Sequence, residues 1–181
     1  MDQTPLVSII TPSFNQGKFL EETMLSVLNQ DYPNIEYIVI DGGSTDESLE
    51  VIKKYQHRLA YWVSEKDRGQ TEAINKGFSH ANGQILAWLN SDDTYTPGAV
   101  REAVDFMTAH SEIGMVYGDL DFIDENGRVI GRFNAAQTDL PRLRRGYVHI
   151  PQPAAFFRAE LWKKIGPLDP GFFFAMDYDL W

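Results

Sequence analysis

Hydrophobic and polar positions follow two patterns that alternate along the first 110 residues of the chain. Short apolar runs rich in β-branched residues have the composition of buried strands. Between these runs, apolar residues recur three or four positions apart, which is typical of helices that bury one face. The pattern predicts strands over 6–10, 35–40, 59–63 and 85–89, and helices over 18–29, 44–55, 70–81 and 97–110.

Four β-α units in succession favour a mostly parallel sheet with helices on both of its faces. Local signals indicate where three of the helices begin or end. The segment 44–47 has the Ser-Thr-Asp-Glu spacing of a capping box, which predicts a helix start there. Thr96 and Pro97 suit the N-cap and first turn of the fourth helix, and Gly83 suits the end of the third.

The pattern changes after residue 115. Two apolar runs, 115–123 and 129–133, flank Asn126-Gly127, and this dipeptide between such runs predicts a hairpin. A short segment over 140–146 carries three arginines. The remaining predictions are a strand over 152–157, a helix over 159–165 and a loop over 167–174. We therefore predict an α/β three-layer sandwich with a small antiparallel addition in its second half.

Composition narrows the class of protein. The 181 residues suit one domain over 1–181, and a hydrophobic fraction of 43% suffices for a core. A formal net charge of -10 argues against a nucleic-acid-binding face. The absence of Cys excludes disulfides, thiolate nucleophiles and zinc–thiolate sites. No signal peptide or membrane span is recognised, so we expect a cytoplasmic protein. The run 177–181 resembles the start of an element, so we expect a fragment that lacks a C-terminal region.

Polar residues gather just after the predicted strands. The four groups are 11–15, 41–44, 68–70 and 90–93. In a parallel sheet with helical crossovers, ligands bind at the carboxyl ends of the strands. These groups should therefore meet at one edge of the sheet, although they lie far apart in the sequence.

Ser91-Asp92-Asp93 follows the apolar strand 85–89. Adjacent carboxylates repel each other unless a positive charge lies between them. A divalent cation is the natural candidate, because hard cations prefer carboxylate oxygens. The alternative is a solvated Asp-rich turn before a helix.

The other candidates each have a structural alternative. Asp41, followed by Gly42 and Gly43, is a carboxylate suited to accepting hydrogen bonds from a ligand, or part of a turn that serves only the fold. Phe14 could stack on a flat ring or lie in the core. Arg68 could meet a phosphate or pair with a nearby acid such as Asp67. Neither GxGxxG nor GxxxxGK[ST] is present, which disfavours a dinucleotide site and excludes a P-loop.

Two acidic residues follow the aromatic loop 172–174 near the end of the chain. Asp177 and Asp179 are therefore candidates for a general base, because apolar surroundings favour a carboxylate that takes up a proton. The alternative is a favourable position for acids at a helix start. Asp119 and Asp121 form a similar pair, which we expect on the surface of the hairpin.

Three segments of the chain together resemble a known family. SIITPSFNQGKFLEETMLSVLNQ, IEYIVIDGGSTDES and ANGQILAWLNSDD are similar, in order and spacing, to the donor half of GT-A, family-2 glycosyltransferases. This resemblance implies a GT-A (Rossmann-like) fold with a nucleotide-sugar half over 1–110 and an acceptor-side half over 111–181. It also implies transfer of a sugar, with inversion, from a nucleotide-diphosphate donor, most often a UDP-sugar.

The resemblance also implies roles for individual residues. Asp41 would read the base, Asp93 would hold Mn²⁺ or Mg²⁺, and Asp92 would contact ribose or sugar. MDYDLW resembles the family motif in which Asp177 is the catalytic base, with Met176 in place of the usual Glu. The implied nucleotide-sugar contacts are Thr11, Pro12, Phe14, Asn15, Asp41, Gly43, Arg68, Gln70, Asn75, Asn90, Ser91 and Asp92.

The expected acceptor is a hydroxyl of a saccharide or of a lipid-linked saccharide, in keeping with polysaccharide or cell-envelope synthesis. A missing C-terminal region would then allow peripheral association with the inner face of the membrane. One alternative is a non-catalytic or truncated sugar-nucleotide-binding module. A metal-dependent phosphatase is disfavoured, because Thr11-Pro12 stands where an Asp would be needed after the first strand.

Overall fold

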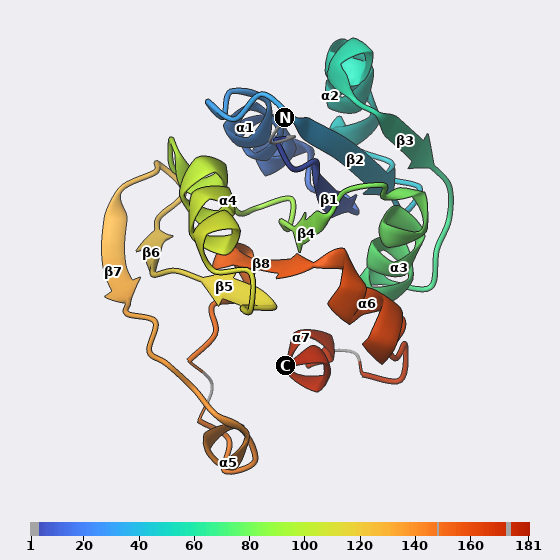
Figure 1. The fold of residues 1–181 in the computed structure, drawn as a ribbon. Coiled ribbons are helices and arrows are strands. Elements are labelled where there is room, and N and C mark those ends of the chain that lie inside the picture. The colour runs from blue at the N-terminus through green and yellow to red at the C-terminus, as the bar shows by residue number, and fades with distance from the viewer. Residues whose placement is uncertain (1–3, 148, 173–174) are drawn as a thin grey trace.

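A six-stranded sheet lies at the centre of the fold (Figure 1). The computed structural model describes residues 4–147, 149–172 and 175–181. The strand order is β3-β2-β1-β4-β8-β5, and the first four of these strands are mutually parallel. They are the four strands predicted from the apolar runs: β1 (Val7–Ser13), β2 (Ile35–Asp41), β3 (Tyr61–Ser64) and β4 (Ile85–Trp88).

Helices cover both faces of this sheet and bury two separate apolar clusters. The first cluster contains buried residues of α1 (Gly17–Leu28), α2 (Ser48–Tyr55) and α4 (Ala99–Ala109). The second contains buried residues of α3 (Gln70–His80), against which α6 (Ala159–Ile165) and α7 (Met176–Leu180) pack. Neighbouring β1 residues, Ile9 and Ile10, belong to opposite clusters, as strand geometry requires. The predicted three-layer α/β sandwich is confirmed.

The second half of the chain adds antiparallel strands. β8 (Ala155–Arg158) lies between β4 and β5 (Met115–Tyr117) and is antiparallel to both. The predicted hairpin forms a separate two-stranded sheet of β6 (Leu120–Ile123) and β7 (Val129–Phe133). Three short elements complete the description: η1 (Gln56–Arg58), α5 (Leu140–Leu143) and η2 (Gln152–Ala154).

Three strand predictions need correction. The strand expected over 152–157 is shorter, because residues 152–154 form η2 and β8 begins at Ala155. The run 115–123 is divided, because β5 joins the central sheet while β6 pairs with β7. The first strand continues through Pro12 to Ser13 instead of ending at residue 10. Pro12 is tolerated there because pairing with β4 stops at Ile10, so its missing N–H breaks no bond of the sheet on that side.

The predicted capping box is wrong. The second helix begins at Ser48, and its N-cap residue, Glu47, makes no side-chain capping bond. The Asp46 carboxylate instead accepts hydrogen bonds from the backbone N–H groups of Ser48 (3.0 Å) and Gly17 (2.8 Å). One side chain therefore caps the N-termini of α1 and α2 together. Burial alone would raise the pKa of Asp46, but hydrogen bonding from the Ser48 side chain, and then from backbone N–H groups including those of Gly17 and Ser48, outweighs burial and lowers it.

The other two helix signals are wrong as well. The N-cap of α4 is Gly98, with a φ of 85°, and not Thr96. The third helix ends at His80, before Gly83. A side chain at Gly83 would come within 2.6 Å of the backbone nitrogen of Ser8. Glycine is therefore needed there for the close approach of two chain segments, and not as a helix terminator.

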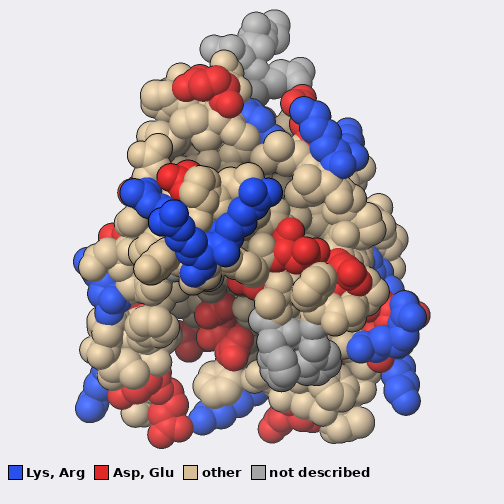
Figure 2. Space-filling model, turned by 90° about the horizontal axis from the view of Figure 1, so that it is seen from below, with Lys and Arg blue, Asp and Glu red and all other residues tan. Residues whose placement is uncertain are grey.

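Charge is spread unevenly over the surface. The face seen in Figure 2 carries a group of basic side chains that project beside a hollow containing acidic side chains. Over the described ranges, no helix combines the length and the apolar character that crossing a bilayer requires.

Candidate functional site

The carboxyl ends of β1 and β4 form the switch point of the sheet. After β1 the chain builds β2 and β3 on one side, and β4 then pairs with β1 on its other side. Open α/β sheets bind ligands in the crevice at such a point. Register places Ser13 level with Asp41, and Asp41 level with Ser64. The ends of the strands therefore coincide, as the sequence predicted.

Asp41, at the end of β2, is fully buried and surrounded by donors. Its carboxylate accepts hydrogen bonds from the backbone N–H groups of Gly43 (3.1 Å) and Ser44 (3.0 Å). It also accepts from the hydroxyls of Ser44 (2.5 Å) and Ser64 (2.6 Å). Three of these bonds end on Oδ2 and one, from the Ser44 hydroxyl, ends on Oδ1, so Oδ2 is saturated and Oδ1 can accept a further hydrogen bond. Because Asp41 has no exposed surface, a nucleobase N–H could reach Oδ1 only after a neighbouring group, such as the Ser44 hydroxyl, moves aside.

The two glycines after Asp41 are required by the packing of the protein itself. Gly43 has a φ of 82°, and a side chain at Gly42 would come within 2.8 Å of the Asp67 carboxylate. The loop after β3 therefore occupies the space that these glycines leave open. This geometry favours the interpretation that the Asp-Gly-Gly turn serves the fold.

Phe14 and Asn15 follow β1. The ring of Phe14 is exposed, whereas Asn15 is held by hydrogen bonds to the loop after β2. Phe14 is 60% exposed, which is unusual for an aromatic residue beside a sheet and leaves its ring open for stacking. Asn15 joins β1 to the loop after β2, since its backbone N–H donates to the Ser44 hydroxyl (2.8 Å) and its side-chain oxygen accepts from the Thr45 N–H (2.9 Å). Its left-handed backbone, with a φ of 52°, suits asparagine.

Thr11 and Pro12 do not reach the surface of the site. Both residues are buried within β1. The Thr11 hydroxyl lies 2.9 Å from the Tyr37 hydroxyl in the core. Ser13 is also buried, and its hydroxyl has no hydrogen-bond partner within the described residues.

Asp92 and Asp93 lie in the turn after β4. Asp92 is exposed and Asp93 is half-buried. Burial, and then the negative charge of Asp92, raise the pKa of Asp93 to about 6, while a hydrogen bond from Asn90 opposes this shift. Over the described ranges, neither carboxylate is within ion-pair distance of a Lys, Arg or His. The pair therefore carries negative charge that the described protein groups do not neutralise.

A chain of side-chain amides holds Asp93 in place. The Asn90 amide nitrogen donates to the Asp93 carboxylate and to the Gln152 side-chain oxygen, both at 3.1 Å. The Asn90 oxygen accepts from Gln70 (2.6 Å), and the Gln152 nitrogen donates to the Trp88 carbonyl (2.8 Å). Every polar atom of the Asn90 side chain is thus used, and the orientation of the amide is determined.

Gln152 and Ser64 are site residues that the sequence analysis missed. Ser64 directly follows the predicted strand 59–63, so its place at a strand end could have identified it. Gln152 had no such signal. It reaches the carboxyl end of β4 because β8 is antiparallel to β4, which brings the beginning of β8 to that edge. Nothing in the local pattern of residues 151–158 predicts this direction.

Two predicted ligand contacts are engaged elsewhere. The Arg68 guanidinium pairs with Glu72 through bonds of 3.1 and 3.3 Å, and the arginine remains largely exposed. The acid is therefore Glu72 and not Asp67. The Asn75 amide makes two hydrogen bonds of 2.9 Å with the backbone of Leu168, and this pair ties α3 to the loop before α7.

Asp177 lies in the first turn of α7 and is half-buried. The helix is anchored by its neighbours. Met176 is buried against the second cluster, and Trp181 stacks on Trp88 with ring centroids 5.9 Å apart. Since Trp88 ends β4, this stack brings α7 close to the strand that leads into Asp92 and Asp93. Phe173 and Phe174 of the predicted aromatic loop lie outside the described residues.

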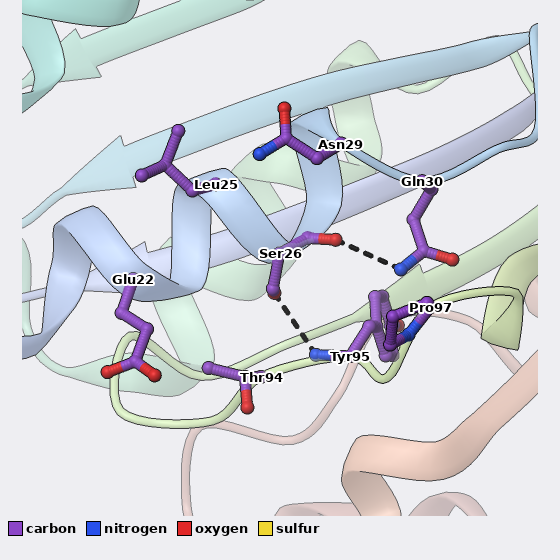
Figure 3. A pocket seen from close by; sticks show the side chains of 8 residues that line it. All are labelled: Glu22, Leu25, Ser26, Asn29, Gln30, Thr94, Tyr95 and Pro97. Atoms are coloured by element: carbon purple, nitrogen blue, oxygen red, sulfur yellow. Dashed lines mark hydrogen bonds between the residues drawn. The ribbon is translucent and has the colours of Figure 1, made fainter. Parts of the chain in front are cut away.

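A shallow hollow of about 290 Å³ lies elsewhere, between α1 and the segment before α4 (Figure 3). Its lining includes Ser26 and Gln30 of the first helix region, together with Thr94 and Tyr95. The Ser26 hydroxyl accepts a hydrogen bond from the Tyr95 backbone N–H (3.1 Å). None of the predicted nucleotide contacts lines this hollow, so we do not identify it with the site.

Within the described residues, no three His, Cys, Asp or Glu side chains come together closely enough to hold a metal ion by themselves. The oxygen donors of Asp92 and Asp93 nevertheless suit a hard divalent cation. A cation there would need oxygens from a bound ligand or from water, and this is a common arrangement for Mg²⁺.

Comparison with curated proteins finds relatives named as glycosyltransferases. An uncharacterized glycosyltransferase of Mycobacterium tuberculosis is 36% identical over 99% of this chain and 68% of its own length. One from Nostoc is 29% identical over 91% of this chain and 54% of its own length. The chain therefore spans between about half and two thirds of these relatives.

Solved structures show the same fold. The S. aureus TarS fragment 1–349, in complex with UDP, has a TM-score of 0.78 and 22% identity, over 96% of this chain and 53% of that one. The Pyrobaculum calidifontis mannosyltransferase PcManGT, in complex with GDP-Man and Mn²⁺, has a TM-score of 0.69 and 23% identity, over 93% of this chain and 48% of that one. At these identities the likeness concerns the fold, which is GT-A.

The family model described as glycosyl transferase family 2 matches residues 8–179, which include every predicted site residue. The mostly parallel sheet and its order of strands agree with the fold that the resemblance implies. The chain therefore belongs to glycosyl transferase family 2.

Proposed function

We propose that this chain transfers a sugar from a nucleotide-diphosphate donor to an acceptor hydroxyl, with inversion at the anomeric carbon. One observation carries the proposal: two adjacent carboxylates, Asp92 and Asp93, lie at the switch point without a described counter-charge. Such a site is suited to a divalent cation together with the phosphates of a nucleotide.

The donor half comprises residues 1–110, and a UDP-sugar is the proposed donor. The exposed ring of Phe14 is available to stack on the base. Asp41 receives the base N–H when the Ser64 or Ser44 hydroxyl turns away from it. Complexes of the structural neighbours with UDP, UDP-GlcNAc and GDP-Man support a nucleotide-sugar donor. They leave the base open between uracil and guanine.

Asp93 is the proposed metal ligand, and Asp92 lies beside it to contact the ribose, the sugar or the metal. Bound Mn²⁺ or Mg²⁺ would supply positive charge to the leaving nucleoside diphosphate. Asn90 and Gln152 orient the Asp93 carboxylate before any ligand arrives. The Mn²⁺ in the mannosyltransferase complex supports this assignment.

Asp177 is the proposed general base, in the acceptor-side half 111–181. An acceptor hydroxyl has a pKa far above 7, so a carboxylate must take its proton as the new bond forms. Inversion requires that the base and the leaving group lie on opposite faces of the sugar. Asp177 and Asp93 come from different elements, α7 and the turn after β4, and this placement permits such a separation. The proposed acceptor is a saccharide or a lipid-linked saccharide.

Calorimetric titration tests the donor site first. UDP, GDP and dTDP are titrated into the wild-type chain and into Asp93→Ala, each with Mn²⁺ and with EDTA. We expect one nucleotide to bind in the presence of Mn²⁺ and that binding to be lost in Asp93→Ala. Asp105→Asn is the matched control, because it removes an exposed carboxylate from α4.

Other outcomes separate the alternatives. Failure of all three nucleotides to bind a folded wild-type chain would contradict the donor site. Binding that is equal with and without Mn²⁺ would remove the metal from the proposal. Nucleotide binding without transfer, even when a longer chain that extends beyond Trp181 is supplied, would favour a non-catalytic sugar-nucleotide-binding module.

A further inference from the structure

The loop between β7 and β8 carries three arginines that the donor site does not use. Arg142 belongs to α5, and Arg144 and Arg145 follow it directly. All three side chains are exposed or nearly so, and within the described residues none of them lies in an ion pair. Among the other six arginines of the chain, Arg68, Arg101 and Arg132 each pair with an acid, and the remaining three lie in no ion pair within the described residues. We refer to residues 139–147 as the arginine segment.

What distinguishes the arginine segment is that three arginines without an ion pair lie within four residues of one another, in a protein where acidic groups predominate. The chain contains 26 Asp and Glu against 16 Lys and Arg, so carboxylate partners are plentiful. The arginine segment nevertheless contains a single acid, Asp139, whose carboxylate accepts the Arg142 backbone N–H (2.8 Å) as a helix cap. The Arg142 guanidinium donates one bond, to the Gln137 carbonyl (2.8 Å), and keeps its other donors. Planar guanidinium donors match the oxygens of a phosphate or a carboxylate.

The arginine segment is joined to the helix that carries the proposed base. The Tyr178 hydroxyl donates a hydrogen bond to the backbone carbonyl of Leu143. Tyr178 is next to Asp177, and Leu143 is next to both Arg142 and Arg144. A group bound by these arginines would therefore lie beside the first turn of α7. In Figure 1, α5 lies away from the sheet, at the same end of the molecule as α7.

We infer that the arginine segment binds a negatively charged group, a phosphate or a carboxylate, on the acceptor saccharide. This inference rests on the proposed function. The acidic turn at Asp92 and Asp93 repels an anion, while the arginines attract it. Figure 2 shows basic side chains projecting beside a hollow that contains acidic ones. Opposed charges would orient such an acceptor, with its anionic group on the arginines and a neutral hydroxyl toward Asp177.

A membrane surface fits the same segment less well. Two large apolar side chains are exposed there, Leu140 (56%) and Tyr147 (58%). The helix that carries Leu140 has only four residues, however, and membrane-binding helices rely on an extended apolar face. Since Tyr178 ties the segment to α7, a saccharide is the favoured ligand.

Saccharide binding provides the test, measured by fluorescence titration with and without UDP and Mn²⁺. The probes are hexagalacturonate, a phosphomannan oligosaccharide and neutral maltohexaose. We expect the wild-type chain to bind at least one anionic probe about tenfold more tightly than maltohexaose, with a preference that falls as salt increases. Arg144→Gln/Arg145→Gln should lose this preference and still bind UDP.

Lys163→Gln/Lys164→Gln is the matched control, because it removes two exposed positive charges from α6. It should keep the preference for the anionic probe. Equal binding of charged and neutral probes, or an equal loss in both double variants, would overturn the inference. The inference would also be overturned if the wild type bound vesicles containing phosphatidylglycerol through Arg144 and Arg145 and showed no preference among the saccharides. Failure of the wild type to bind UDP would instead count against the proposed function.

Discussion

The donor edge and the acceptor side of this molecule are held together in different ways. Asp41 is buried under four hydrogen bonds, and Asn90 fixes Asp93 through an amide chain anchored on two other elements. The acceptor side rests on short helices, α5 with four residues and α7 with five. The contacts that hold these two helices include a Trp88–Trp181 stack, a bond from Tyr178 to Leu143 and the burial of Met176 in the second cluster.

From this difference we expect substitutions in the two regions to have different effects, on stability in one and on turnover in the other. Groups in a dense network lose several bonds at once when one member is replaced, so their substitution costs folding free energy. A half-buried acid on a short helix contributes little to folding. Donor-edge variants that break this network, such as Asp41→Asn, should therefore lose stability together with binding, and Asp177 variants should lose turnover alone.

The largest expected effect is on turnover. Asp177→Asn keeps the size of the side chain but cannot take a proton from the acceptor. General-base removal typically costs about 10²–10⁴ in rate, so we expect kcat to fall by that amount while nucleotide binding is unchanged. The measurement is the rate at which the nucleotide is released, which reports both donor hydrolysis and sugar transfer to an acceptor mixture.

Asp179→Asn is the control for this comparison, because Asp179 is exposed two residues further along α7. A larger loss in Asp179→Asn than in Asp177→Asn would move the base to Asp179. A loss of nucleotide binding in Asp177→Asn would show that the two sides are not independent.

The next effect concerns stability. Asp41→Asn leaves an amide nitrogen facing donors that previously met a carboxylate oxygen. We expect a loss of about 3 kcal/mol in the free energy of unfolding, because a buried network is left with unsatisfied groups. Urea unfolding followed by fluorescence measures it. Asp105→Asn, at an exposed position, should change the same quantity by less than about 0.5 kcal/mol. Equal small effects in both variants would contradict a stabilising Asp41 network.

A smaller effect of opposite sign is expected at Asp93. Its pKa is raised to about 6 by burial and then by Asp92, from an ordinary value of about 4. The folded state thus holds this proton more tightly than the unfolded chain. Asp93 favours folding below about pH 4 and loses that contribution as the pH rises through about 6. Without metal, Asp93→Asn should therefore be more stable than wild type by about 2–3 kcal/mol at pH 8, since each of the two pKa units corresponds to about 1.36 kcal/mol.

Urea unfolding in EDTA at pH 4 and pH 8 tests this prediction. The stabilisation should vanish at pH 4, and Mn²⁺ with nucleotide should stabilise the wild type alone. Asp92→Asn, at the exposed neighbour, should give a much smaller gain. An Asp93→Asn protein less stable than wild type at pH 8 would mean that the carboxylate is compensated in the fold.

The smallest predicted effect is at Gln152, which connects the two sides. Gln152→Leu removes its bonds to Asn90 and to the Trp88 carbonyl. We expect about 1 kcal/mol lower stability and a Kd for nucleotide with Mn²⁺ raised about fivefold, a change of about 1 kcal/mol. Gln137→Leu, at an exposed position in the same half, is the control. Unchanged nucleotide affinity in Gln152→Leu would restrict the amide chain to a structural role.

The local pattern of apolar and polar residues was sufficient to predict the strands and helices of the first half of the chain. Buried strands need apolar β-branched runs and amphipathic helices need a 3.6-residue period, so both are written in neighbouring residues. The positions of polar residues after the predicted strands also located the Asp92–Asp93 turn and Asp41 at one edge of the sheet. Local pattern failed at helix ends, where Asp46 caps two helices at once although its neighbours matched a capping box.

The sequence by itself determined the α/β architecture, the family, and the edge of the sheet at which the candidate site residues meet. Only the tertiary structure decided that β8 runs antiparallel beside β4 and so brings Gln152 to Asn90. It also decided that Arg68 pairs with Glu72 and Asn75 with the Leu168 backbone. The physical reason is the sequence separation involved. The periodicity that predicts a strand or a helix can be seen within a few neighbouring residues. The partner of a polar side chain instead depends on which distant segments the fold places beside it.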